Sequence, residues 1–183
     1  MRDIYEILKS FALPRAHTSL LLMEFKQFFL KTAALPGEVS SQYTNLYLRH
    51  FGSGMDSIVL TPEQPKYIKA HMDGKRITFT SATHEGRKWG LALCRDGEQH
   101  AGWEKVEIVD REGSDGLLFT QGEEGSVEEV LEFEEELAGE RVWKGWMVCE
   151  WAHGYPQLFW VTHKLNRELP SFCHRVQVVR EML

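Results

Sequence analysis

Apolar and polar positions alternate along most of the chain from Phe25 onward, a pattern typical of half-buried β-strands. In the segment 43–51, for example, Leu46 and Leu48 alternate with Tyr47 and Arg49. Turn-forming Gly, Pro and Asp residues separate such runs at short intervals. The pattern predicts about nine to ten short strands and therefore an all-β protein.

Two pairs of these runs predict β-hairpins. Asp73-Gly74 lies between the runs 67–72 and 75–80, and an Asp-Gly pair favours a two-residue turn because both central positions need positive φ. Farther along, the aromatic-rich runs 146–152 and 157–163 flank a four-residue turn. We therefore expect an antiparallel β sandwich or a flattened barrel.

Two segments depart from the alternation and predict helices. Residues 2–12 place apolar side chains on one helical face, and Pro14 ends this segment. In the segment 122–140, Ser126 and Glu129 have the spacing of a capping box at a helix N-terminus. The sequence thus predicts an N-terminal helical appendage over 1–24 and a single β domain over 25–183, with an acidic helix or loop inserted at 122–140.

The composition narrows the class of protein more than the function. The 183 residues are 43% hydrophobic and 26% charged, which is typical of a globular domain. No apolar run approaches the roughly 20 residues that a membrane-spanning helix needs. Nine of the 27 acidic residues lie in 122–140, and the remaining 18 face 21 basic residues elsewhere. A nucleic-acid-binding protein usually has a denser basic stripe than this, so we expect neither a nucleic-acid nor a membrane partner.

The cysteines leave several chemistries open. Cys149 lies four residues before His153, and Cys173 and His174 follow 20 residues later. Cysteine and histidine bind zinc, but this spacing matches none of the usual zinc motifs, and we predict no metal site. A disulfide between Cys149 and Cys173 and buried reduced cysteines are the other two interpretations.

The last predicted hairpin carries the candidate functional residues. Glu150 and His153 could act as a general acid and base, and Trp151, His153 and Tyr155 could line a ligand site. Acid–base catalysis also needs a pocket and a shifted pKa, which the sequence does not display.

Other aromatic residues and motifs add little catalytic chemistry. Trp146 and Trp160 lie among aliphatic residues and are predicted to fill the core. The stretch 52–54 is Gly-Ser-Gly, but no G-x-S-x-G nucleophile motif is present. The Gly-rich stretches 113–116 and 122–125 carry acidic residues, which would repel phosphate. The sequence therefore predicts no cofactor.

Two C-terminal segments resemble a known family: GWMVCEWAHGYPQLFW at 145–160 and LPSFCHRV at 169–176. Shorter matches occur at 29–32, 45–48 and 89–93, so the resemblance runs from about Phe25 to the C-terminus. The family consists of small fungal proteins of unknown function, many of them secreted. In family members an aspartate and a second tryptophan stand where this chain has Glu150 and Ala152.

The resemblance implies that Cys149 and Cys173 are the paired cysteines of the family and that Cys94 is additional. It implies secretion, whereas the first 25 residues do not have the pattern of a signal peptide and by themselves predict a cytoplasmic protein. It supplies no catalytic residues, because the family has no known activity.

Two functions follow from these observations. The first is a non-catalytic binding or interaction protein with a small apolar ligand or a protein as its partner, and the family resemblance implies that it is secreted. The second is a small cofactor-free enzyme of the isomerase or cyclase type, with an aromatic pocket and with Glu150 or His153 as acid or base. We favour the first, because nothing in the sequence assembles a convincing catalytic set.

Overall fold

Strands make up all of the regular secondary structure that the structure, a computed structural model, describes. The described residues are 26–50, 58–66, 68–81, 87–95, 102–122, 128–134, 136–137, 140–150, 154–165 and 168–183. The helix expected at residues 2–12 and the appendage 1–24 lie outside these ranges. The described part of the chain contains no helix with the length and apolar character that a membrane crossing requires.

The described residues form 14 strands, more than the nine to ten that the sequence predicted. The strands are β1 (Phe28–Ala33), β2 (Tyr47–His50), β3 (Ile58–Thr61), β4 (Ile68–Asp73), β5 (Arg76–Ser81), β6 (Trp89–Leu93), β7 (Trp103–Val109), β8 (Leu117–Gln121), β9 (Glu129–Phe133), β10 (Glu136–Leu137), β11 (Glu140–Arg141), β12 (Trp143–Glu150), β13 (Pro156–Thr162) and β14 (Cys173–Met182). The undercount arose mainly in the acidic segment, where a helix or a loop was expected.

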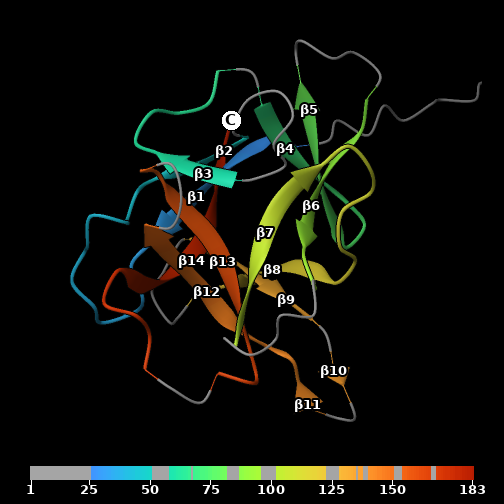
Figure 1. Ribbon diagram of the computed structural model, residues 1–183. Helices are drawn as coiled ribbons and strands as arrows, with labels where there is room; N and C mark the ends of the chain where they lie inside the picture. Colours follow the sequence, from blue (N-terminus) through green and yellow to red (C-terminus); the bar gives the residue numbers. More distant parts are fainter. Residues whose placement is uncertain are drawn as a thin grey trace, which may run out of the picture.

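Twelve of the strands form one antiparallel sheet in the order β3-β2-β1-β4-β5-β6-β7-β13-β12-β14-β9-β8. Additional pairings of β3 with β13 and of β1 with β14 make this sheet close on itself. The architecture is therefore one curled sheet and not the two stacked sheets of a sandwich. Figure 1 shows β7, β13 and β12 side by side, with the small β10–β11 hairpin standing apart from them.

The acidic segment contains a strand where a capped helix was predicted. β9 pairs with β8 over its whole length and meets β14 where Val130 faces Val179. Its side chains explain the difference, because Leu131 and Phe133 alternate with Glu132 and both enter the core. The helix prediction gave weight to the spacing of Ser126 and Glu129 and overlooked this period of two. Ser126 itself lies outside the described residues.

The β4–β5 hairpin is present, but its turn lies one residue later than predicted. Asp73 pairs with Arg76, so Gly74 and Lys75 are the two central residues. Of these two only Gly74 has a positive φ, 63°. A turn that needs positive φ only at its first central position favours glycine there, which accounts for the shift.

The interior of the closed sheet is filled with apolar side chains from nearly every strand of the sheet. Trp146 and Trp160 face each other across β12 and β13 and are only 1% and 2% exposed. Their indole nitrogens donate hydrogen bonds to the backbone oxygens of Leu131, at 2.6 Å, and Cys94, at 3.2 Å. The prediction that both tryptophans belong to the core is confirmed.

Strands β12 and β13 are also buried on their outer face. Met147, Cys149, Phe159, Val161 and Cys173 form a second apolar cluster there. Trp103, Leu165 and Leu169 pack against it from β7 and from the segment that connects β13 to β14. A strand covered on both faces carries a continuous apolar run, which is why the alternation is lost at 146–149 and at 158–161.

Candidate functional site

The structure places Glu150 at the end of the sheet, between the ends of two neighbouring strands. Glu150 is the last residue of β12 and pairs with Pro156, the first residue of β13. On its other side, its backbone N–H donates a hydrogen bond of 3.2 Å to the backbone oxygen of Phe172, which immediately precedes β14. Trp151 and His153, the other candidates from the same hairpin, lie outside the described residues.

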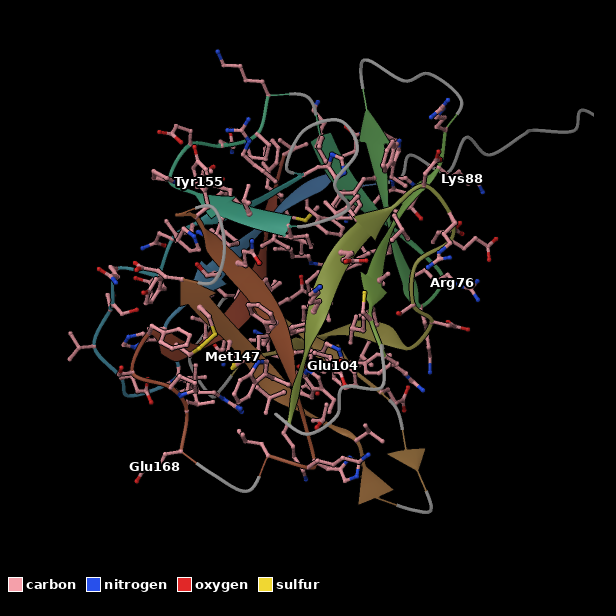
Figure 2. All side chains as sticks on the ribbon, viewed as in Figure 1. Arg76, Lys88, Glu104, Met147, Tyr155 and Glu168 are labelled. Carbon is pink, nitrogen blue, oxygen red and sulfur yellow. A yellow bond between two sulfur atoms is a disulfide. The ribbon has the colours of Figure 1, made fainter. Side chains whose placement is uncertain are left out.

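Aromatic side chains lie exposed on both sides of Glu150. Tyr155 precedes β13 and is 46% exposed, and Phe172 precedes β14 and is 41% exposed. Figure 2 shows Tyr155 at the end of the molecule where β3 and β13 meet. We refer to Glu150, Tyr155 and Phe172 together as the strand-end surface.

A buried tyrosine supports this surface from the inner side of the sheet. Tyr43 is 2% exposed, and its ring lies 4.9 Å from that of His174, centroid to centroid. Thr32 holds the Tyr43 backbone in place through a hydrogen bond of 2.6 Å from its hydroxyl to the Tyr43 carbonyl oxygen. Sequence reasoning missed Tyr43, because it lies more than 100 residues from the hairpin that carried the other candidates.

Burial raises the pKa of the Tyr43 hydroxyl, and the charge of Glu150 and a hydrogen bond with it raise that pKa further, against an opposing hydrogen bond with Gln42. The hydroxyl therefore remains protonated at neutral pH and can donate to the carboxylate. The buried phenol therefore lies within reach of the exposed Glu150 carboxylate.

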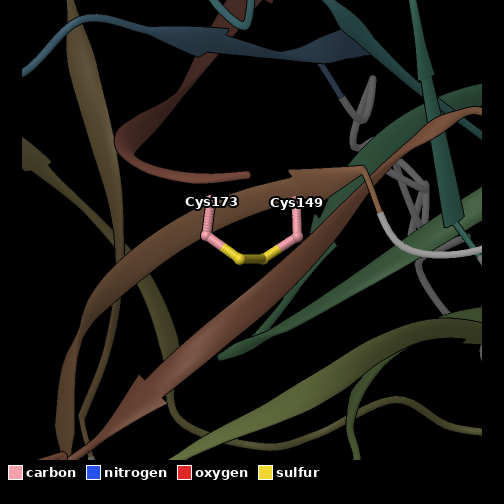
Figure 3. Close-up of a disulfide and its surroundings, with 2 residues drawn as sticks. All are labelled: Cys149 and Cys173. Atoms are coloured by element: carbon pink, nitrogen blue, oxygen red, sulfur yellow. A yellow bond between two sulfur atoms is a disulfide. The ribbon is translucent and has the colours of Figure 1, made fainter. Parts of the chain in front are cut away.

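A disulfide between Cys149 and Cys173 joins β12, which ends at Glu150, to β14, which Phe172 immediately precedes (Figure 3). The two cysteines face each other directly in the β12–β14 pairing, and their Cα atoms are 4.1 Å apart. This is the pair that the family resemblance implied. The disulfide, one of the interpretations drawn from the residues, is therefore the one that the structure contains.

The tryptophan that the sequence placed in a ligand site, Trp151, lies outside the described residues. Trp146 and Trp160 point into the core, and Trp143 is largely buried. The exposed aromatic side chains beside Glu150 are Tyr155, which was predicted, and Phe172, which was not. Phe172 directly precedes Cys173, so the alternation of a strand starting at 173 would have predicted that it points away from the buried disulfide.

The described residues include no group of three or more His, Cys, Asp or Glu side chains that could hold a metal ion. The strand-end surface instead offers one carboxylate, two aromatic faces and a buried phenol that supports the carboxylate. Such a set can bind a cationic or apolar group, since aromatic faces attract cations and a carboxylate accepts hydrogen bonds from them.

Comparison with known proteins finds one family. The sequence model described as a domain of unknown function (DUF7907) matches residues 26–182. No curated protein and no solved structure matches the chain.

Proposed function

The chain belongs to the DUF7907 family, and we propose that it is a non-catalytic binding protein whose strand-end surface docks a protein partner. The observation that carries the proposal is the position of Tyr155 and Phe172, exposed on either side of the Glu150 carboxylate. Aromatic side chains are enriched among the residues that dominate binding energy at protein interfaces.

The chemistry of the surface favours a basic side chain on the partner. A lysine or arginine could pair with Glu150 while its alkyl stem lies against Tyr155 or Phe172, which combines an ion pair with cation–π attraction. None of the three residues that define the surface carries a positive charge that would oppose such a group.

The surface is also held rigidly. The disulfide, the β12–β13 pairing and the hydrogen bond from the Glu150 N–H to the Phe172 oxygen all fix the backbone around Glu150. A preorganised surface loses little conformational entropy on binding, so a few aromatic contacts can suffice for specificity.

An enzymatic role for Glu150 has less support. The Glu150 side chain is exposed, whereas acid–base catalysis gains from a site that excludes water. Of the three residues proposed to line a pocket, Trp151 and His153 lie outside the described residues and Tyr155 is exposed. The alternative of a small isomerase or cyclase therefore ranks second.

The disulfide supports a second element of the proposal, that the protein acts outside the reducing cytosol. Structural disulfides are rare in cytosolic proteins and persist in oxidising compartments. This agrees with the secretion that the family resemblance implies.

Selection from a random peptide library displayed on phage, with the intact disulfide-bonded protein as target, tests the binding proposal. We expect the selected peptides to contain Arg or Lys beside an apolar residue. Their affinity should fall at least tenfold for Tyr155→Ser and for Phe172→Ser, which corresponds to about 1.4 kcal/mol each.

Met182→Ser is the matched control. Met182 is 46% exposed, like Tyr155, but it lies at the opposite end of β14. Peptides that lose affinity equally for the control and for the strand-end variants, or that carry no basic residue, would contradict the proposal.

A further inference from the structure

A cleft of about 330 Å³ lies over the outer face of β6 and β7, apart from the strand-end surface. That volume is at the lower end of the range for small-molecule sites. Its walls come from the end of β6, from β7 and from the loop that follows β7. The lining residues are Ala92, Leu93, Cys94, Arg95, Glu107, Arg111, Glu112, Gly113 and Ser114.

The loop wall of this β6–β7 cleft is fastened to the sheet by backbone contacts. The Ser114 N–H donates a hydrogen bond of 2.8 Å to the Leu91 oxygen, and the Ser114 hydroxyl oxygen accepts one of 2.9 Å from the Leu93 N–H. At Gly113, the residue before Ser114, the loop backbone lies directly against β6. A Cβ atom added to Gly113 would come within 2.3 Å of the Leu91 oxygen. The cleft is therefore preformed, which favours binding because no loop has to be ordered.

Two opposite charges line the cleft without pairing with each other. Within the described part of the chain, neither Arg111 nor Glu107 belongs to an ion pair. The other lining carboxylate, Glu112, already lies 3.8 Å from the Arg76 guanidinium. The lining also includes a second arginine, Arg95. The cleft thus offers a ligand the Arg111 guanidinium and the Glu107 carboxylate without an ion pair having to be broken.

We propose that the β6–β7 cleft binds a small zwitterion of the amino-acid class. Arg111 would hold the ligand's carboxylate, since a guanidinium matches a carboxylate with two parallel hydrogen bonds. Glu107 would hold the ammonium group, which donates hydrogen bonds and accepts none. Ala92, which pairs with Glu107 across β6 and β7, provides apolar surface beside the carboxylate.

Three probes of similar size separate this chemistry from simpler alternatives: L-alanine carries both charges, propionate only the carboxylate and propylamine only the ammonium group. We titrate each into ¹⁵N-labelled protein and follow the backbone amide signals of Leu93, Gly113 and Ser114. L-Alanine should shift these signals saturably, at concentrations at least tenfold lower than either of the other probes. This follows because each hydrogen-bonded charge contributes more than a factor of ten in affinity. Equal binding of propionate and alanine, or no saturable shift at these amides, would overturn the proposal.

Single-charge variants test the two assigned roles. Arg111→Gln and Glu107→Gln should each weaken alanine binding about tenfold. Arg87→Gln is the control, because Arg87 is exposed, pairs with Asp110 at 3.3 Å and does not line the cleft. The amide spectrum of each variant shows whether it is folded, so a folded Arg111→Gln or Glu107→Gln protein with unchanged affinity would refute the corresponding role.

Discussion

Cys149 and Cys173 are joined across a directly opposed pair of positions on β12 and β14, inside an apolar cluster that lies outside the main core. The residues that follow Cys149 and precede Cys173 are Glu150 and Phe172, two of the three members of the strand-end surface. The disulfide therefore links the stability of the outer cluster to the geometry of the proposed interface.

Removing this disulfide should destabilise the protein substantially. The bond closes a loop between residues 24 apart in sequence, and the chain-entropy model assigns about 3–4 kcal/mol to a loop of that size. We expect the double variant Cys149→Ala/Cys173→Ala to lose about this much free energy of unfolding in urea titration. Cys94, which is not part of a disulfide, serves as control, and Cys94→Ala should cost less. A loss below about 1 kcal/mol for the double variant would mean that strand pairing alone holds this end of the sheet.

Trp160 tests the assignment of the aromatic residues to the core. Trp160→Ala should cost about 3–5 kcal/mol as a large-to-small core substitution, whereas Tyr155→Ala, at an exposed position, should change the stability by about 0.5 kcal/mol or less. Both values come from denaturant titration monitored by circular dichroism. If the two substitutions cost the same, Trp160 does not support the core as its burial indicates.

Local signals in the sequence predicted the strands, but not how the chain closes. The Asp73-Gly74 pair predicted the β4–β5 hairpin, and the aromatic runs around residues 153–156 predicted the pairing of β12 with β13. β1 pairs along its whole length with β14, about 150 residues away. Alternating strands with similar apolar faces can pair in many ways, so no local pattern specifies this partner.

The candidate sites could also be predicted only where their residues lie close together in the sequence. Glu150 and Tyr155 came from one hairpin and could be proposed together. Phe172 and Tyr43 reach Glu150 only through the β12–β14 and β1–β14 pairings. The β6–β7 cleft depends on how the loop carrying Arg111 folds back onto β6. Such loop paths are set by tertiary contacts and leave little trace in a single sequence.

Glu181 should make the stability depend on pH in the acid range. Burial of the Glu181 carboxyl raises its pKa, but hydrogen bonds from Lys31 and Tyr47 outweigh burial and hold the pKa below its ordinary value of 4.5. The unfolded carboxyl thus takes up its proton at a higher pH than the folded one. Its contribution to stability is complete above pH 4.5 and is lost as the pH falls through the lower folded-state pKa.

The measurement compares the wild-type protein with Glu181→Gln in urea titrations from neutral pH downward. The difference in unfolding free energy should be largest near neutrality and shrink below pH 4.5. Tyr47→Phe removes one donor, which lies 3.1 Å from the carboxylate, and should reduce the pH-dependent part without abolishing it. A difference that stays constant with pH would show that Glu181 titrates alike in both states.

Glycine is required for different reasons at Gly37 and at Gly113: a positive φ at the first, and the close approach of another backbone segment at the second. Gly37 has a φ of +75° and open space around it, so Gly37→Ala should cost only the strain of a left-handed backbone, about 1–2 kcal/mol. At Gly113 an added Cβ would lie 2.3 Å from the Leu91 oxygen, and its three nearest atoms all belong to the Leu91 backbone. Backbone cannot rotate away as a side chain can, so Gly113→Ala must push the loop off β6 and break the bonds that Ser114 makes.

We therefore expect Gly113→Ala to cost more free energy of unfolding than Gly37→Ala and to shift the amide signals of Leu93 and Ser114, while Gly37→Ala leaves those signals in place. Equal costs and undisturbed signals would mean that the loop is not seated on the sheet, and the preformed cleft would lose its basis.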